Sequence, residues 1–138
     1  MKLKTFDNSS NVFRRDSPAA ISINVTAGLF TINKKATEIL QIEAGNKVVL
    51  HQDEDELGDW YIEKADQDAA GFEIRSKTKN GKPEGGGIYF NNTPTARAIF
   101  ESVEYPYQSG RILLAGEPTE IGERKLYALL TDGLKNEE

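Results

Sequence analysis

Basic side chains in two short groups are the residues of this sequence whose type and spacing could do chemistry. One group lies just before an apolar helical pattern and the other on an alternating stretch: Lys34 and Lys35, then Arg75, Lys77, Lys79 and Lys82. Residues two apart in a β-strand point to one face, so Arg75, Lys77 and Lys79 would form a stripe. Such a stripe could contact the phosphates of a nucleic acid. These six residues are the predicted nucleic-acid-binding site.

Each basic group also has an interpretation that involves no ligand. Lys34 and Lys35 could simply be solvated at the start of a helix, where lysines only slightly oppose the helix dipole. The stripe could protect an exposed strand from pairing edge to edge with another sheet. The formal net charge of −5 favours this second interpretation, because non-specific nucleic-acid binding requires a positive field. A local basic patch would still be sufficient, since binding depends on where the charges lie.

The remaining polar groups show no catalytic or metal-binding pattern. The carboxylates between residues 53 and 59 could hold a hard cation, but they lack the glycine and terminal glutamate spacing of an EF-hand loop. An acidic, solvated hairpin tip is therefore expected. His51 is the only histidine and cysteine is absent, so no metal-ligand pair or Ser–His pairing can be recognised, and His51 is expected to be structural. The sequence predicts a non-enzymatic protein without catalytic residues, metal or cofactor.

The glycine-rich residues 81–87 resemble a phosphate-binding loop only in composition. A strand pattern rather than a helix follows them, and no Gly-Lys-Ser/Thr opens a helix. We predict a flexible connector between two halves of the chain.

The composition is that of one globular domain. A chain of 138 residues fits a single domain or two small halves that share a core, and 38% hydrophobic with 28% charged residues excludes a disordered chain. The first residues lack the apolar segment of a signal peptide, and no apolar run approaches the length of a membrane span. A cytoplasmic protein that does not contact a membrane is expected.

The first part of the chain combines strands with one short helix. Residues 1–18 are polar without periodicity and are predicted to be a flexible N-terminal arm. Asn33 suits a helix N-cap, and Ala36, Ile39 and Leu40 form one apolar helical face. The predicted elements are strands at residues 21–25 and 29–32, a helix at 34–41, and strands at 48–52 and from residue 60.

The second part has a similar order. Thr93 suits an N-cap with Pro94 at the first helical position. The Asn-Gly pair at Asn80 predicts a hairpin turn. The predicted elements are strands at residues 72–79 and 88–90, a helix at 94–103, strands at 112–114 and 126–130, and a frayed C-terminus at 134–138.

The order strand, strand, helix, strand, strand thus occurs twice, in residues 20–64 and 71–131. Ile39 corresponds to Ile99 at a separation of 60 residues and Tyr61 to Tyr127 at 66, a drift expected when insertions fall in loops. The sequence predicts a β-rich α+β fold, a small barrel or sandwich of two ββαββ halves packed as a pseudo-dimer. The two halves would form one domain over residues 19–133.

Residues 28–50 resemble the swapped-hairpin domain of AbrB-type transition-state regulators and related antitoxins. The stretch covers 23 of the 138 residues, and its matching positions are Gly28, Phe30-Thr31-Ile32, Lys34, Leu40, Ile42, Gly45-Asn46, Val48 and Leu50. The resemblance implies a small barrel of two interleaved copies whose paired elements bind DNA. MraZ-like proteins carry two such units in one chain, as this sequence is predicted to do.

The chain departs from that family at positions that matter for DNA. Leu29 and Thr37 stand where the family usually has arginines, Asn33 replaces a proline, and Asn46 replaces an aspartate. The resemblance as a whole implies a DNA-binding regulator whose partner is duplex DNA. The missing arginines and the acidic charge instead favour a non-catalytic protein-interaction or assembly module that has another protein as its partner. Either class allows a homo-oligomer.

Overall fold

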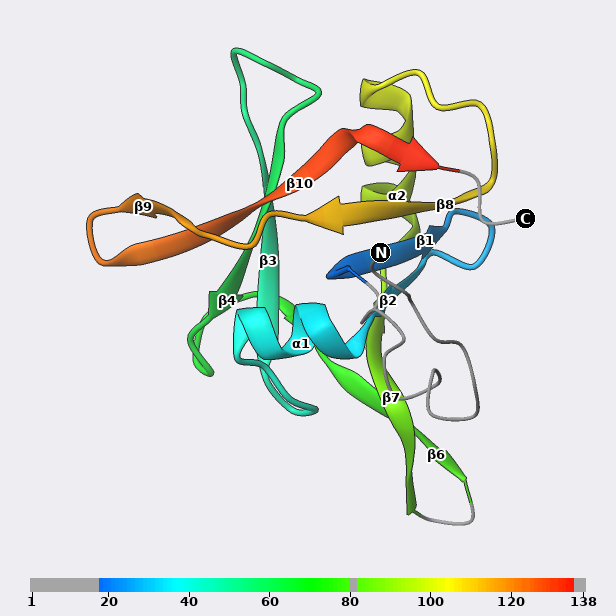
Figure 1. Cartoon of the computed structure of the whole chain (residues 1–138), viewed down its shortest axis with the longest axis vertical. Helices are drawn as coiled ribbons and strands as arrows, with labels where there is room; N and C mark the ends of the chain where they lie inside the picture. The colour runs from blue at the N-terminus through cyan, green and yellow to red at the C-terminus, as the bar shows by residue number, and fades with distance from the viewer. Residues whose placement is uncertain (1–17, 80–81, 136–138) are drawn as a thin grey trace, which may run out of the picture.

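The computed structural model describes residues 18–79 and 82–135, which form one nearly closed, barrel-like antiparallel sheet with two helices (Figure 1). The predicted β-rich α+β class is confirmed at this level. The first elements are β1 (Ala20–Asn24), β2 (Leu29–Ile32), α1 (Lys34–Leu40), β3 (Lys47–Gln52) and β4 (Trp60–Ala65). They are followed by β5 (Phe72–Glu73), β6 (Arg75–Lys79), β7 (Lys82–Asn91), α2 (Thr93–Ser102), β8 (Ser109–Leu114), β9 (Thr119–Ile121) and β10 (Arg124–Lys135).

The sheet has the order β5-β3-β4-β10-β8-β1-β2-β7-β6, and β9 pairs with β10 beside this path. The end strands β5 and β6 follow each other in the sequence, so the chain itself joins the two ends of the sheet. Ile74 is the joining residue and is 1% exposed. Its N–H donates to the carbonyl of Asn46, and its carbonyl accepts from the N–H of Gly45, both at 2.8 Å. These two hydrogen bonds hold the sheet nearly closed.

The prediction of one continuous strand over residues 72–79 is wrong, because β5 and β6 are separated at Ile74. The strand breaks at Ile74 because its two parts pair with different neighbours, Phe72 with Val48 on β3 and Ser76 with Ile88 on β7. The alternating pattern of the sequence predicts the faces of a strand but not a change of partner within it.

The core forms from the inward residues of the strands and one face of each helix. The alternation of Ile21 and Ile23 turns both toward the core, and the i, i+4 spacing turns Ala36 and Leu40 of α1 toward the same core. Leu40 is 4% exposed, as the helical pattern predicts, whereas Ile39 is only partly buried. The other helix contributes Ala96, Ile99 and Phe100.

Asparagine side chains begin both helices. The Oδ1 of Asn33 accepts from the N–H of Ala36 at 2.9 Å, which confirms the predicted N-cap. In α2 the cap is Asn92, whose Oδ1 accepts from the N–H of Thr95 at 3.0 Å, so the prediction of Thr93 is wrong by one residue. Asn92 has the extended backbone of a cap, and its side chain reaches the same orphan donor that a threonine would.

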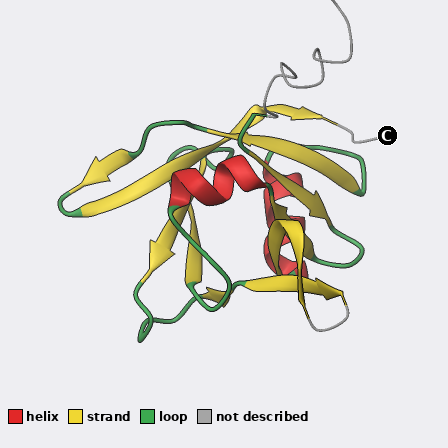
Figure 2. Cartoon of the chain, turned by 60° about the horizontal axis from the view of Figure 1, so that its bottom comes forward, coloured by secondary structure: helices red, strands yellow, loops and turns green. Residues whose placement is uncertain are grey.

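The prediction of a flexible connector at residues 81–87 is also wrong for residues 82–87, since β7 begins at Lys82 and pairs with β6; residue 81 lies outside the described part of the chain. Glycine weakens a strand but keeps the backbone donor and acceptor that the ladder requires. The register shifts between Ser76 and Thr78, which accommodates the extra residues of β7. The last strand, β10, continues past position 133 to Lys135 and forms with β9 a long hairpin that projects from the barrel (Figure 2). In the described ranges, no helix is long and apolar enough to cross a membrane.

Candidate functional site

The structure brings the backbones of the two predicted basic groups to one end of the sheet. Strands β2 and β6 lie on opposite sides of β7, so Thr31 pairs with Tyr89, which pairs with Arg75. Both strands are antiparallel to β7 and therefore run in the same direction, about 10 Å apart. The chain passes from β2 into α1 at Lys34, while β6 continues from Arg75 toward Lys79. The backbones of Lys34 and Lys35 and those of the residues after Arg75 therefore all follow the Thr31–Tyr89–Arg75 row in the same direction.

Three of the six predicted residues have described side chains, and all three are exposed: Lys34, Lys35 and Arg75. The side chains of Lys77, Lys79 and Lys82 lie outside the described part of the structure. Their backbones belong to the β6–β7 hairpin, where Lys79 pairs with Lys82 (Figure 1). We define Lys34, Lys35, Arg75, Lys77, Lys79 and Lys82 as the basic end of the molecule.

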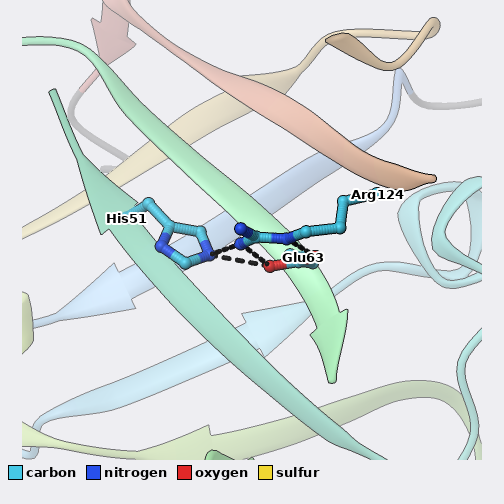
Figure 3. Close-up of polar contacts among 3 residues, drawn as sticks. All are labelled: His51, Glu63 and Arg124. Carbon is cyan, nitrogen blue, oxygen red and sulfur yellow. Dashed lines mark hydrogen bonds and ion pairs between the residues drawn. The ribbon is translucent and has the colours of Figure 1, made fainter. Parts of the chain in front are cut away.

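A polar cluster that the sequence did not predict links β3, β4 and β10 (Figure 3). The Nε2 of His51 lies 2.8 Å from the Oε1 of Glu63. The guanidinium of Arg124 donates from Nε to the Oε2 of Glu63 at 2.8 Å and from Nη2 to Oε1 at 2.6 Å. Arg124 Nη2 also lies 3.3 Å from His51 Nε2. The two nitrogens of Arg124 therefore bind both oxygens of one carboxylate, the strongest geometry for such a pair.

The electrostatics of this cluster keep Glu63 ionised. The Arg124 hydrogen bonds, aided by His51 and opposed by partial burial, lower the pKa of Glu63 to about 2. The same carboxylate raises the pKa of Arg124. A carboxylate with so low a pKa is a weak base, because it gains little by accepting a proton near neutral pH. The ionised Glu63, held through both oxygens by Arg124, therefore joins β4 to β10.

The cluster lines a hollow of about 600 Å³ between β3, β4, β10 and the turn after β4. Val49, Tyr127 and Lys64 also line the hollow, and the Nζ of Lys64 donates to the carbonyl of Gln41 at 3.0 Å. Acidic and basic side chains both line this hollow, so its electrostatics favour neither an anionic nor a cationic ligand. Within residues 18–79 and 82–135, no three His, Cys, Asp or Glu side chains are arranged to hold a metal ion.

One of the contacts in this cluster, that between His51 and Glu63, follows from the pairing of two neighbouring strands. In the β3–β4 hairpin, Val49 pairs with Glu63 and His51 with Tyr61, so His51 and Glu63 are diagonal neighbours once the hairpin register is known. Arg124 is 61 residues from Glu63, and no local pattern marks it as a partner. The acidic turn between β3 and β4 is exposed at most positions, as predicted.

Comparison with known proteins gives no family for this chain. No family model matches it, and neither the curated proteins nor the solved structures include a match.

Proposed function

We propose that this protein is a non-enzymatic, cytoplasmic DNA-binding regulator of the AbrB type, in which two ββαββ halves of one chain pack as a pseudo-dimer. The first half comprises β1, β2, α1, β3 and β4. The second comprises β5 and β6 as one interrupted strand, then β7, α2, β8 and β10.

The strand order supports the pseudo-dimer. Exchanging each strand with its counterpart leaves the order of the sheet unchanged, because β2 pairs with its counterpart β7 and β4 with its counterpart β10. The same exchange converts the β1–β8 pair into the β5–β3 pair. Each half therefore contributes strands to both sides of the barrel, as two interleaved copies would.

The single observation that carries the DNA proposal is the basic end. Arg75 lies in the Thr31–Tyr89–Arg75 row of the sheet, and Lys34 and Lys35 follow the same row at the end of β2; all three are exposed and come from segments far apart in the sequence. The first turn of α1 contains no carboxylate, and Glu38 follows one turn later, four residues after Lys34. Contacts from these groups to phosphates would position a duplex without reading its sequence.

A second candidate, a protein-interaction or assembly module, is favoured by the asymmetry of the charges. The second half begins its helix with Thr93, Pro94 and Thr95, so the lysines of the first half have no counterpart there. A symmetric DNA-binding surface would need both. The net charge of −5 adds to this argument.

A titration of duplex DNA at several salt concentrations tests the first candidate. Binding through phosphates should weaken with salt at a log–log slope of about −0.9 per neutralised phosphate. The triple change Arg75→Glu, Lys77→Glu and Lys79→Glu should abolish binding, and Lys34→Glu with Lys35→Glu should weaken it. The matched control for the lysine pair is Arg97→Glu with Lys125→Glu, which changes the net charge equally at exposed positions outside the basic end. Absence of binding by the unmodified protein at low salt would exclude the regulator.

If binding survives the triple change unaltered, the DNA site must be assigned instead to Lys34 and Lys35 at α1. Equal loss in the control variant would mean that net charge rather than the basic end determines binding.

A further inference from the structure

A second hollow, of about 530 Å³, lies between the β3–β4 turn and the C-terminal end of α2. Its apolar lining comes from Leu57, Ala98 and Val103, and the carboxylates of Glu101 and Glu104 stand beside it. Leu57 is 58% exposed, so its apolar side chain is accessible to a partner beside those of Ala98 and Val103. We call this feature the end hollow.

Hydrogen bonds hold the walls of the end hollow in place. The Nε1 of Trp60 donates to the Oγ of Ser102 at 2.9 Å, which joins the start of β4 to the end of α2. The hydroxyl of Thr131 donates to the carbonyl of Gly58 at 2.8 Å, and the amide of Gln52 donates to the carbonyl of Leu57 at 2.7 Å. A partner would therefore meet a preformed surface, and binding would avoid most of the entropic cost of ordering a mobile loop.

The charges at the end hollow are negative. Glu101 and Glu104 line it, no Lys or Arg of the described residues does, and four further exposed carboxylates lie on the turn that carries Leu57: Glu54, Asp55, Glu56 and Asp59. We call these six carboxylates the rim. Among the described side chains, the ion pairs are those of Glu63 with His51 and Arg124, so none of the rim carboxylates has a cationic partner there. Figure 1 shows the β3–β4 turn and the β6–β7 hairpin at opposite ends of the long axis. The acidic and basic ends of the molecule are thus separate surfaces.

We propose that the end hollow binds a basic segment of another protein that carries a large apolar side chain between its lysines or arginines. The apolar side chain would cover Leu57 and Val103, and the flanking cations would meet the carboxylates of the rim. Duplex DNA does not fit this surface, because its phosphates would be repelled. The inference goes beyond DNA binding and does not depend on it, since it uses none of the residues of the basic end.

Three synthetic peptides serve as probes of the full chain, followed by methyl and amide NMR shifts. Lys-Arg-Leu-Phe-Arg-Lys should shift the signals of Leu57 and Val103 with a saturable, salt-sensitive titration. Lys-Arg-Gly-Ser-Arg-Lys lacks the apolar anchor and should bind at least tenfold more weakly. Glu-Glu-Leu-Phe-Glu-Glu should not bind, because its charges repel the rim. Equal binding of the first two peptides, or no binding of the first, would overturn the proposal.

Paired variants locate the site. Leu57→Ser should weaken the first peptide at least tenfold, whereas Ile121→Ser, at a side chain that is 55% exposed, should leave it unchanged. Glu101→Lys with Glu104→Lys should abolish binding. The equal charge change at Glu117 and Glu120 should have little effect, since these exposed residues lie outside the end hollow.

Two further measurements separate the alternatives. A duplex DNA titration of the Leu57→Ser variant, which keeps the net charge, reports on the regulator proposal alone, so either proposal can fail without the other. Sedimentation of the unmodified protein shows whether a second copy already fills the end hollow. A dimer that the same double variant dissociates would overturn the proposal, because the occupant would be this chain itself. Equal losses of peptide binding in site and control variants would also overturn it.

Discussion

Phe30 and Phe90 lie opposite each other across the β2–β7 pair, with nearly parallel rings whose centroids are 4.5 Å apart. Phe72 stacks on the ring of Phe90 as well, at 5.0 Å. The three rings come from β2, β7 and β5, and β5 is the end strand on the opposite side of the open sheet order. The aromatic stack therefore helps to hold the two ends of the sheet together.

The first prediction concerns this stack. Phe30→Ala and Phe90→Ala should each lower the free energy of unfolding by about 3–5 kcal/mol, because both rings are almost fully buried. In a double-mutant cycle by urea unfolding, the two residues should show a coupling of about 0.5–1.5 kcal/mol. Phe72→Ala is the control for a partly buried ring and should cost less. Additive losses at Phe30 and Phe90 would contradict a direct energetic contact between the rings.

The second prediction concerns acid stability. The folded pKa of Glu63 is lowered to about 2 from 4.5, so its ionised form stabilises the fold. This contribution is complete above the unfolded pKa of 4.5 and is lost as the pH falls through about 2. Its size is about 1–3 kcal/mol, reduced by solvent because the Arg124 side chain is 54% exposed. Unfolding by urea at a series of pH values from neutral to acid measures it.

Glu63→Gln is the control for the acid prediction. The amide keeps the shape of the side chain but cannot be ionised, so the variant should be less stable at neutral pH and should lose the part of the acid dependence that Glu63 causes. A variant whose stability falls with pH as steeply as that of the unmodified protein would show that other carboxylates are responsible.

The third prediction uses a pair of glycines. Gly28 has a φ of +64°, and a Cβ there would lie 2.6 Å from the backbone nitrogen of Thr93. Gly122 has a φ of +62° with no atom within 4 Å of the same position. Gly122→Ala should therefore cost about 1–2 kcal/mol from backbone conformation alone, and Gly28→Ala clearly more, because the backbone of α2 must also move. Thermal unfolding of the two variants compares them, and equal losses would contradict the close approach.

Local patterns made much of this fold predictable. The two-residue period of β1 and the i, i+4 spacing in α1 are set by neighbours in sequence, so Ile21, Ile23 and Leu40 were recognisable as core residues. The break at Ile74 was not, because it depends on a hydrogen-bonding partner about 30 residues away at Asn46. Strand β9 was missed for another reason. All three of its residues are exposed, so it has no alternating pattern.

The candidate site was likewise predictable only in the features that depend on local sequence. The basic residues were visible as types and spacings, but only the β2–β7–β6 register reveals that Lys34 and Arg75 share one end of the sheet. The Arg124–Glu63 pair has no local signature, since it arises from the tertiary approach of β10 to β4.

The fourth prediction concerns α1. Leu40→Ala should lower the free energy of unfolding by about 2–5 kcal/mol, because Leu40 is buried under the barrel. Ile39→Ala on the neighbouring, partly buried position should cost less. Urea unfolding of both variants gives the comparison, and a larger loss at Ile39 would mean that the helix presents a different face to the core.

The fifth prediction tests the interleaving of the two halves. A protease site inserted into the exposed turn between β4 and β5 would divide the chain at residues 67–69. Four strand pairs connect the resulting fragments: β2–β7, β1–β8, β4–β10 and β3–β5. Because these four backbone ladders would still join the fragments, the cleaved protein should elute as one species on gel filtration. The fragments should separate only in denaturant. The uncleaved insertion variant is the control for any effect of the added residues. Separation of the fragments without denaturant would contradict the interleaved arrangement and remove the main support for the pseudo-dimer.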